Sequence, residues 1–222
     1  MICIVSFIVV FTFSQYAQYY FGDNSVPLDR LVTLATAAFF MAVSRYSLFR
    51  DRRLDIVFLT VFCVISASLF IIPPASYAGN FINILLLAPF IEEYFFRGFM
   101  LGLVYDSAIG EKDLRTKIAA VIAAISVSLG GFVIMHTMNE YLYSFIYGFY
   151  FTLIFIAFRS LRNKKLSKYA LFLTILPHLL NNLIVFVFNL PPLVGQIIPV
   201  GSVFVILIIW SLFIYKKPLI EY

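Results

Sequence analysis

One apolar stretch of the chain carries three charged residues, and this feature constrains the fold more than any other. Residues 80–105 read NFINILLLAPFIEEYFFRGFMLGLVY and contain Glu92, Glu93 and Arg97. About 20 apolar residues are enough to cross the roughly 30 Å of hydrocarbon in a bilayer. An ionisable group at that depth costs about 2.5–3.5 kcal/mol on insertion scales, so it needs a partner or a function. We therefore interpret this stretch as a membrane-spanning helix that carries a polar site.

Helix geometry predicts different roles for the charged residues. Residues four apart share a helix face, so Glu93 and Arg97 are predicted to form an ion pair. Glu92 lies about 100° around the helix from Glu93, so Arg97 reaches it less easily. The sequence thus predicts that Glu93 is held by Arg97 and that Glu92 is available for chemistry. Gly98 and Gly102 form a G-x-x-x-G pattern, which predicts the close approach of a neighbouring helix.

The composition indicates a polytopic membrane protein. Of the 222 residues, 63% are apolar and only 12% are charged, whereas an ordinary soluble domain carries about 25% charged residues. The apolar runs predict eight membrane-spanning helices: 1–21, 28–49, 55–72, 80–105, 118–137, 141–158, 169–189 and 198–215. No internal repeat is visible, and no soluble domain fits between the spans. We expect an all-α fold with a single integral-membrane domain over residues 1–222.

The basic residues predict the orientation of these helices. All but two of the 16 lysines and arginines fall in the loops after the second, fourth and sixth spans or in the C-terminal tail. The exceptions are Arg97 and Arg30, which we interpret as the basic residue of the opposite side. Under the positive-inside rule both termini are predicted to be cytoplasmic. Nucleic-acid binding is not expected, because no basic stripe lies outside the loops.

Both histidines of the chain lie inside predicted spans. His136 is in the fifth span and His178 is in the seventh. A single buried histidine is commonly explained by a hydrogen bond to a neighbour. Together with the two glutamates and Arg97, however, the histidines form a set of five ionisable residues on three helices. We expect these five side chains to meet.

Three kinds of chemistry remain open for such a cluster. For hydrolysis, a carboxylate and an imidazole deprotonate a bound water. His178 and Asn182, which are four residues apart, then supply donors for an oxyanion, with Asn181 as the less favoured neighbour. For a zinc site, the ligand set would be Glu92, His136 and His178. A proton-coupled transporter is the third possibility, although the chain lacks the repeated halves of many carriers.

The motifs resemble those of a known family. EEYFFRG, which begins at Glu92, resembles the E-E-x-x-x-R signature of the CAAX-protease and bacteriocin-processing (CPBP, or Abi) family, which includes the type II CAAX prenyl endopeptidases. FVIMH, which ends at His136, resembles the family's F-x-x-x-H motif. HLLNN, from His178 to Asn182, resembles its H-x-x-x-N motif. The motifs occur in the family's order, and the resemblance covers roughly residues 81–189.

The resemblance implies an eight-helix intramembrane endopeptidase. It implies that Glu92 and His136 activate water, that His178 and Asn182 form an oxyanion hole, and that two supporting residues, Glu93 and Arg97, shape the site. It favours a metal-free glutamate mechanism without a cofactor, with zinc as the alternative. The implied partner is a membrane-embedded or lipid-anchored protein or peptide, and we expect the enzyme in a prokaryotic plasma membrane. An inactive membrane scaffold or immunity protein is the alternative from another class.

The predicted depth of the site differs from that of the prenyl-processing members, which are reached from the cytosol. Counted at about 1.5 Å per residue, Glu92 lies near the middle of its span. His136 lies at the non-cytoplasmic end of its own span. The site is therefore predicted in the middle to outer half of the membrane. Two explanations stay open: the span limits are wrong by several residues, or the site is reached differently.

Overall fold

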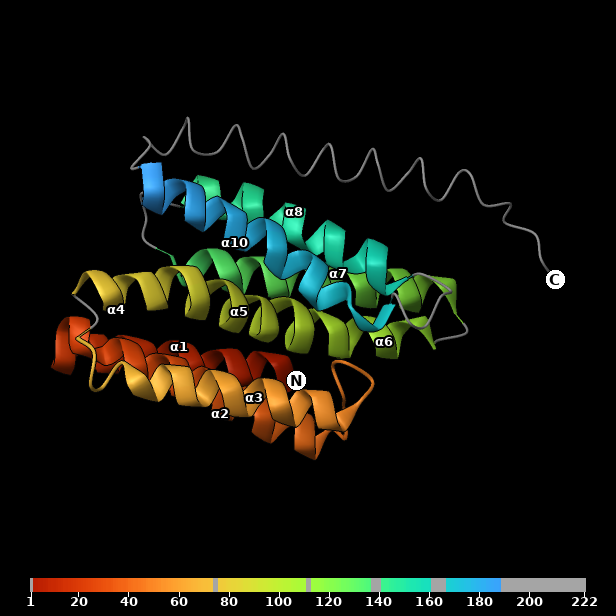
Figure 1. Ribbon diagram of the computed structural model, residues 1–222. Helices are drawn as coiled ribbons and strands as arrows, with labels where there is room; N and C mark the ends of the chain where they lie inside the picture. The colour runs from red at the N-terminus through yellow and green to blue at the C-terminus, as the bar shows by residue number, and fades with distance from the viewer. Residues whose placement is uncertain (1, 74–75, 111–112, 137–140, 161–166, 189–222) are drawn as a thin grey trace.

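The computed structural model describes residues 2–73, 76–110, 113–136, 141–160 and 167–188, and its regular elements are all helical. In these ranges seven long helices lie side by side in a bundle (Figure 1). They are α1 (Ile2–Phe21), α2 (Val26–Val43), α3 (Arg52–Ser68), a composite helix that begins with α4 (Tyr77–Phe81) and ends with α6 (Gly102–Ile109), α7 (Leu114–Ile134), α8 (Tyr141–Arg159) and α10 (Ala170–Phe188). The predicted all-α class is confirmed. The predicted eighth span, 198–215, lies outside the described residues.

The surface of the bundle is suited to lipid. Helices α1, α2, α7 and α8 are each long and apolar enough to cross a membrane. Large apolar side chains are exposed along their outer faces, among them Ile8 on α1, Phe39 on α2 and Leu142 on α8. Exposed apolar surface of this extent is costly in water and ordinary in a bilayer.

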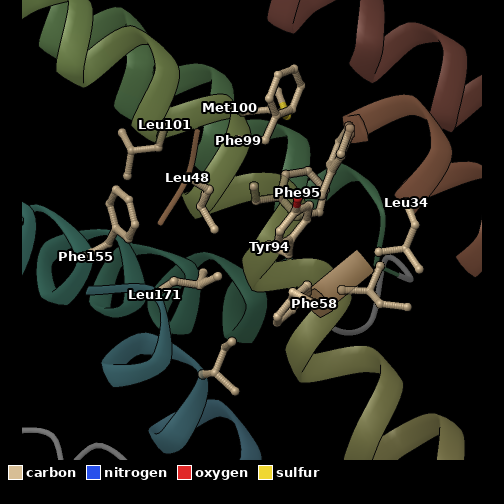
Figure 2. Close-up of a cluster of buried hydrophobic side chains, with 14 of the residues drawn as sticks. Leu34, Leu48, Phe58, Tyr94, Phe95, Phe99, Met100, Leu101, Phe155 and Leu171 are labelled. Carbon is tan, nitrogen blue, oxygen red and sulfur yellow. The ribbon is translucent and has the colours of Figure 1, made fainter. Parts of the chain in front are cut away.

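The composite helix runs through the centre of the bundle without a break from α4 to α6 (Figure 1). Between them lie the π-helical segment η2 (Ile82–Leu87), the α-helical turn α5 (Ala88–Glu92) and the π-helical segment η3 (Glu93–Leu101). Every residue of η3 is buried. Figure 2 shows several of these side chains, including Tyr94 and Phe99, in the apolar core. The helix that carries the charged residues is therefore also the centre of packing.

Pro89 explains a local irregularity of this helix. Ala88 N–H donates to the carbonyl of Asn83, five residues earlier, as is characteristic of a π-helix. In the same pattern residue 89 would donate to the carbonyl of Ile84, but a proline has no N–H group. The Ile84 carbonyl therefore needs a partner from elsewhere in the fold.

The second predicted span is wrong at its C-terminal end. Helix α2 ends at Val43 instead of residue 49, and residues 44–51 form a loop before α3. Arg45 and Arg50 have φ of 54° and 53°, in the left-handed region that cannot continue a right-handed helix. The loop also buries Leu48 in the core, where Figure 2 shows it. Residues 44–49, predicted as the last turns of the helix, instead form a loop whose Leu48 side chain packs in the core.

This loop occupies the space left by the two glycines of the G-x-x-x-G pattern. A Cβ on Gly98 would overlap Leu48, and a Cβ on Gly102 would lie 2.5 Å from the Tyr46 hydroxyl. Phe155 of α8 also approaches Gly102, at 3.3 Å from such a Cβ. The prediction of a neighbouring helix is therefore corrected: the closest neighbour of both glycines is the loop at residues 44–51.

Candidate active site

Glu93 is the anchor of a buried charged cluster. Its Oε1 accepts a hydrogen bond from Arg97 Nη1 at 3.1 Å, and both side chains are fully buried. The predicted ion pair between these residues is confirmed. The same Oε1 lies 2.9 Å from Nδ1 of His178 on α10. Because a carboxylate accepts hydrogen bonds, Nδ1 is the protonated nitrogen of the ring, and Glu93 orients this histidine.

Arg97 connects the composite helix to α7 and α8. Its Nη2 donates to the carbonyl of Gly148 on α8 at 2.9 Å. Its guanidinium carbon lies 4.1 Å from the centroid of the Phe132 ring on α7, a cation–π distance. A Cβ at Gly148 would lie only 3.1 Å from Nη2, so the glycine leaves room for the arginine. Arg97 thus links the helix of the two glutamates to α7 and α8.

Glu92 has a partner that the sequence analysis did not predict. Its Oε1 accepts a hydrogen bond from Nη1 of Arg30 at 3.2 Å, and Arg30 Nε donates to Asn83 Oδ1 at 3.2 Å. Glu92 is thus not held by Arg97, as predicted, but it is bonded to an arginine of another helix. Arg30, which the sequence analysis counts as the basic residue of the non-cytoplasmic side, lies within α2. One sequence signal pointed to this placement: Arg30 is two residues inside the predicted span that starts at residue 28, so it belongs with the ionisable residues within spans.

A cavity of about 210 Å³ brings Glu92 and His136 to one place. It is lined by Val10, Ser14, Asp29, Arg30, Thr33, Glu92, Phe95, Phe96, Met135 and His136. His136 Nδ1 lies 2.7 Å from the carbonyl of Phe132, which assigns the proton to Nδ1 and leaves Nε2 for other groups. Among the described residues, Asp29 Oδ1 is buried without a hydrogen-bond partner. The cavity therefore offers one imidazole, one guanidinium and two carboxylates.

His178 lies near Oε2 of Glu92, the carboxylate oxygen that is not bonded to Arg30. Its Nε2 lies 4.0 Å from Glu92 Oε2. This distance is too long for a direct hydrogen bond but is within the reach of one bridging water. His178 also stacks against Phe151 of α8, with ring centroids 4.9 Å apart and an interplanar angle of 17°. The structure thus brings the five predicted ionisable residues together around Glu92 and Glu93.

Asn182 is held against the composite helix. Its Nδ2 donates to the carbonyl of Ile84 at 2.9 Å, the carbonyl that Pro89 leaves without a helical partner. Its Oδ1 accepts from Asn181 Nδ2 at 3.2 Å. Asn182 does not line the cavity of Glu92 and His136, and one of its two amide N–H groups is used by Ile84. The structure therefore gives this residue a bracing contact in addition to any role in the reaction.

The donor groups as placed do not fit zinc. Within the described ranges, no three His, Cys, Asp or Glu side chains are grouped closely enough to hold a metal ion. The Arg30 guanidinium is bonded to Glu92, and a positive charge there opposes a divalent cation. His178 directs Nδ1 to Glu93, leaving Nε2 4.0 Å from the Glu92 carboxylate. The donor set therefore does not support a metal-dependent step.

Comparison with known proteins identifies the family. Residues 74–184, half of the chain, match the family model of Rce1-like type II CAAX prenyl endopeptidases. The chain belongs to this family. The matched range includes the three motifs that end at Arg97, His136 and Asn182. No curated protein and no solved structure matched the chain.

Membership in the Rce1-like family has two consequences. Together with the apolar helices, it shows that the chain is an integral membrane protein, and it supports a protease activity in general terms. The resemblance noted in the sequence is thus confirmed. Arg30 lies outside the matched range, in the first third of the chain. The three family motifs therefore do not include this arginine.

Proposed function

We propose that this Rce1-like protein is an intramembrane endopeptidase that hydrolyses a peptide bond with a water molecule activated by Glu92. The main support is the position of Glu92, whose carboxylate shares a cavity with His136 and lies 4.0 Å from Nε2 of His178. A carboxylate with imidazoles on two sides can hold a water and accept its proton. The buried rings of Phe95 and Phe96 form part of the cavity wall, and an apolar surrounding of this kind strengthens electrostatic interactions.

In the first step, Glu92 accepts a proton from the water while Nε2 of His136 fixes the orientation of that water. The oxygen forms a bond to the carbonyl carbon of the substrate, and the C=O π electrons move to the carbonyl oxygen. The tetrahedral intermediate then breaks its C–N bond. Glu92 returns the proton to the leaving amine, so the carboxylate is regenerated and the proton count is balanced.

The oxyanion requires hydrogen-bond donors. His178 directs Nε2 towards the reacting groups, because Glu93 occupies its Nδ1. In its protonated form Nε2 donates to the oxyanion, and the second N–H of Asn182 provides another donor on the same helix. Donors fixed before the reaction are effective because they need no reorganisation when charge develops.

Three further residues position this machinery. Glu93 and Arg97 form a fully buried pair that fixes the ring of His178. Arg30 fixes the carboxylate of Glu92 through a hydrogen bond of 3.2 Å. We assign Arg30 as a positioning residue, because it acts on the reaction through Glu92.

The location of the site supports the proposed substrate class. The cavity lies among helices suited to a bilayer, so the substrate is a membrane-embedded or lipid-anchored protein or peptide. The first turns of α2 and the end of α7 both line it, which places it towards the end of the bundle opposite the loop at residues 44–51. The proposed enzyme needs no cofactor and works in a prokaryotic plasma membrane.

The test compares membranes that contain the wild type with membranes that contain Glu92→Gln. The substitution keeps the shape of the side chain and removes the base, so we expect the appearance of new peptide termini to fall at least about 100-fold. Asp113→Asn, which changes an exposed carboxylate, is the matched control and should cleave normally. Identical termini in wild type and Glu92→Gln at equal membrane levels would contradict the proposal and favour a scaffold or immunity protein.

Metal dependence is tested on the purified wild type. Metal analysis should find less than stoichiometric zinc, and cleavage should persist in the presence of a chelator. Stoichiometric zinc together with loss of cleavage on chelation would contradict the metal-free mechanism while leaving the peptidase activity established.

A further inference from the structure

A second cavity lies between α2 and α3, at the end of the bundle where the loop at residues 44–51 joins them. Its volume is about 360 Å³, and it shares no lining residue with the cavity of Glu92. Its walls are Ala38, Met41, Ala42, Arg45, Tyr46, Arg52, Asp55, Ile56 and Leu59. The polar residues gather at the helix ends, and the apolar residues lie further along both helices. The cavity is therefore amphipathic along its length.

Two arginines dominate the polar end. In the described parts of the chain, neither Arg45 nor Arg52 forms an ion pair or a side-chain hydrogen bond, and both are exposed. Their neighbours behave differently: Arg50 pairs with Asp106 at 3.6 Å, and Lys168 pairs with Asp51 at 3.1 Å. Both arginines that line this cavity are thus available to an external anion, whereas Arg50 and Lys168 are already paired.

Asp55 is the acidic residue of the cavity, and its two oxygens are already bonded to the loop. Oδ2 accepts from the Ser47 hydroxyl at 2.6 Å, and Oδ1 accepts from the N–H of Phe49 at 3.4 Å. Asp55 therefore braces the loop, whereas Arg45 and Arg52 are exposed at the polar end of the cavity. Two positive charges against one occupied carboxylate leave the cavity net positive.

The apolar part of the cavity is open to the lipid side of the bundle. Ala38 and Ala42 on α2 have small side chains that leave a groove, and Ile56 on α3 is 63% exposed beside it. A ligand that fills both parts must combine an anionic head with an apolar chain. Helix α2, which is long and apolar enough to cross a membrane, ends at this loop, and α3 begins directly after it. The charged end of the cavity therefore lies at the depth of the lipid headgroups.

We propose that this cavity is a binding site for an anionic phospholipid, with its phosphate between Arg45 and Arg52 and an acyl chain along Ala38 and Ala42. Guanidinium groups bind phosphate oxygens through paired, charge-assisted hydrogen bonds. Basic pockets between membrane-spanning helices are suited to anionic headgroups. A zwitterionic lipid such as phosphatidylcholine carries an ammonium group, and the positive charges of the two arginines repel it. The site is independent of the proposed peptidase activity.

The test is a lipid titration of the purified full-length chain in detergent, followed by native mass spectrometry. We expect dioleoyl phosphatidylglycerol to bind at least tenfold more tightly than dioleoyl phosphatidylcholine. The double variant Arg45→Gln/Arg52→Gln should lose at least tenfold in affinity for phosphatidylglycerol. The matched control, Arg53→Gln/Arg115→Gln, removes the same charge from exposed positions that do not line the cavity and should stay within about twofold of wild type.

A second variant tests the acyl groove without a change of charge. Ala42→Leu fills the groove from a partly open wall, so it should weaken phosphatidylglycerol binding while the melting temperature stays that of wild type. Equal binding of the two lipids by the wild type, or equal losses in the two double variants, would overturn the proposal. So would displacement of phosphatidylglycerol by S-farnesyl cysteine methyl ester at equal concentration, because the occupant would then be a prenyl chain.

Discussion

Replacement of Arg97 by methionine tests the buried charged cluster. Arg97→Met keeps a long apolar side chain beside Phe132 and removes the cation that faces Glu93. Glu93 would remain fully buried, with only the hydrogen bond from His178 Nδ1 left to its carboxylate. The variant also loses the hydrogen bond of 2.9 Å to the Gly148 carbonyl. We expect a large loss of stability for these reasons.

The magnitude follows from the burial of the pair. Removal of one member of a buried ion pair costs about 3–5 kcal/mol, because the other charge is left uncompensated. For a chain of this length, a change of 1 kcal/mol corresponds to roughly 2–4 °C in the melting temperature. We therefore expect Arg97→Met to lower the melting temperature in detergent by about 6–20 °C.

Two further variants make this measurement decisive. Arg50→Gln removes an arginine whose pair with Asp106 is 3.6 Å long and 42% exposed on the arginine side, so it should cost at most about 1 kcal/mol. Glu93→Gln/Arg97→Met removes both charges and should recover part of the loss, since no unpaired carboxylate remains. A melting temperature of Arg97→Met equal to that of Arg50→Gln, or a double variant no more stable than Arg97→Met, would refute this reasoning.

Three other predictions concern single contacts. Arg30→Gln should lower kcat at least about tenfold with little change in KM, because the arginine positions Glu92. Arg30→Lys should restore part of the lost kcat, and equal kcat in all three proteins would contradict that role. Gly148→Ala should destabilise the protein by about 1–3 kcal/mol, because its Cβ would meet three side chains within 3.1 Å. Gly130→Ala should be neutral or stabilising, because nothing lies within 4 Å of its Cβ. Similar melting temperatures of the two variants would contradict this difference. Hydrogen bonds from Thr116 in the first turn of α7 lower the pKa of Asp113 below its ordinary value of 3.8. The stability that this cap contributes should therefore be present above pH 3.8 and lost as the pH falls through the lower folded-state pKa. If the melting temperature of Asp113→Asn falls between pH 6 and 3 as much as that of the wild type, this group is not the cause.

Local sequence determined the helices and the contacts within a helix. The predicted span at residues 141–158 agrees with α8 to one residue, because a long apolar run has few alternatives in a bilayer. The pair of Glu93 and Arg97 was predictable because the spacing of residues four apart on a helix fixes their distance. The family motifs likewise indicated which polar residues belong to one site.

Contacts between helices could not be obtained in this way. Arg30 and Glu92 are 62 residues apart, and Asn182 and Ile84 are 98 residues apart. Their meeting depends on which helices are neighbours and how far each is rotated about its axis. The π-helical segments η2 and η3 change that rotation, because each turn contains more residues than an α-helical turn. A helix face predicted from 3.6 residues per turn is therefore rotated away from its expected direction after η2 and η3.

The sequence by itself determined that this protein is a helical membrane protein and that its ionisable residues within apolar runs belong to one site, since hydrophobicity and spacing are local properties. Only the tertiary structure decided that Arg30 pairs with Glu92 and that the loop at residues 44–51 packs on Gly98. It also decided that Asn182 bonds to the carbonyl left free by Pro89. The physical reason is that a buried polar group is satisfied by whichever partner the packing of the helices brings within hydrogen-bond distance.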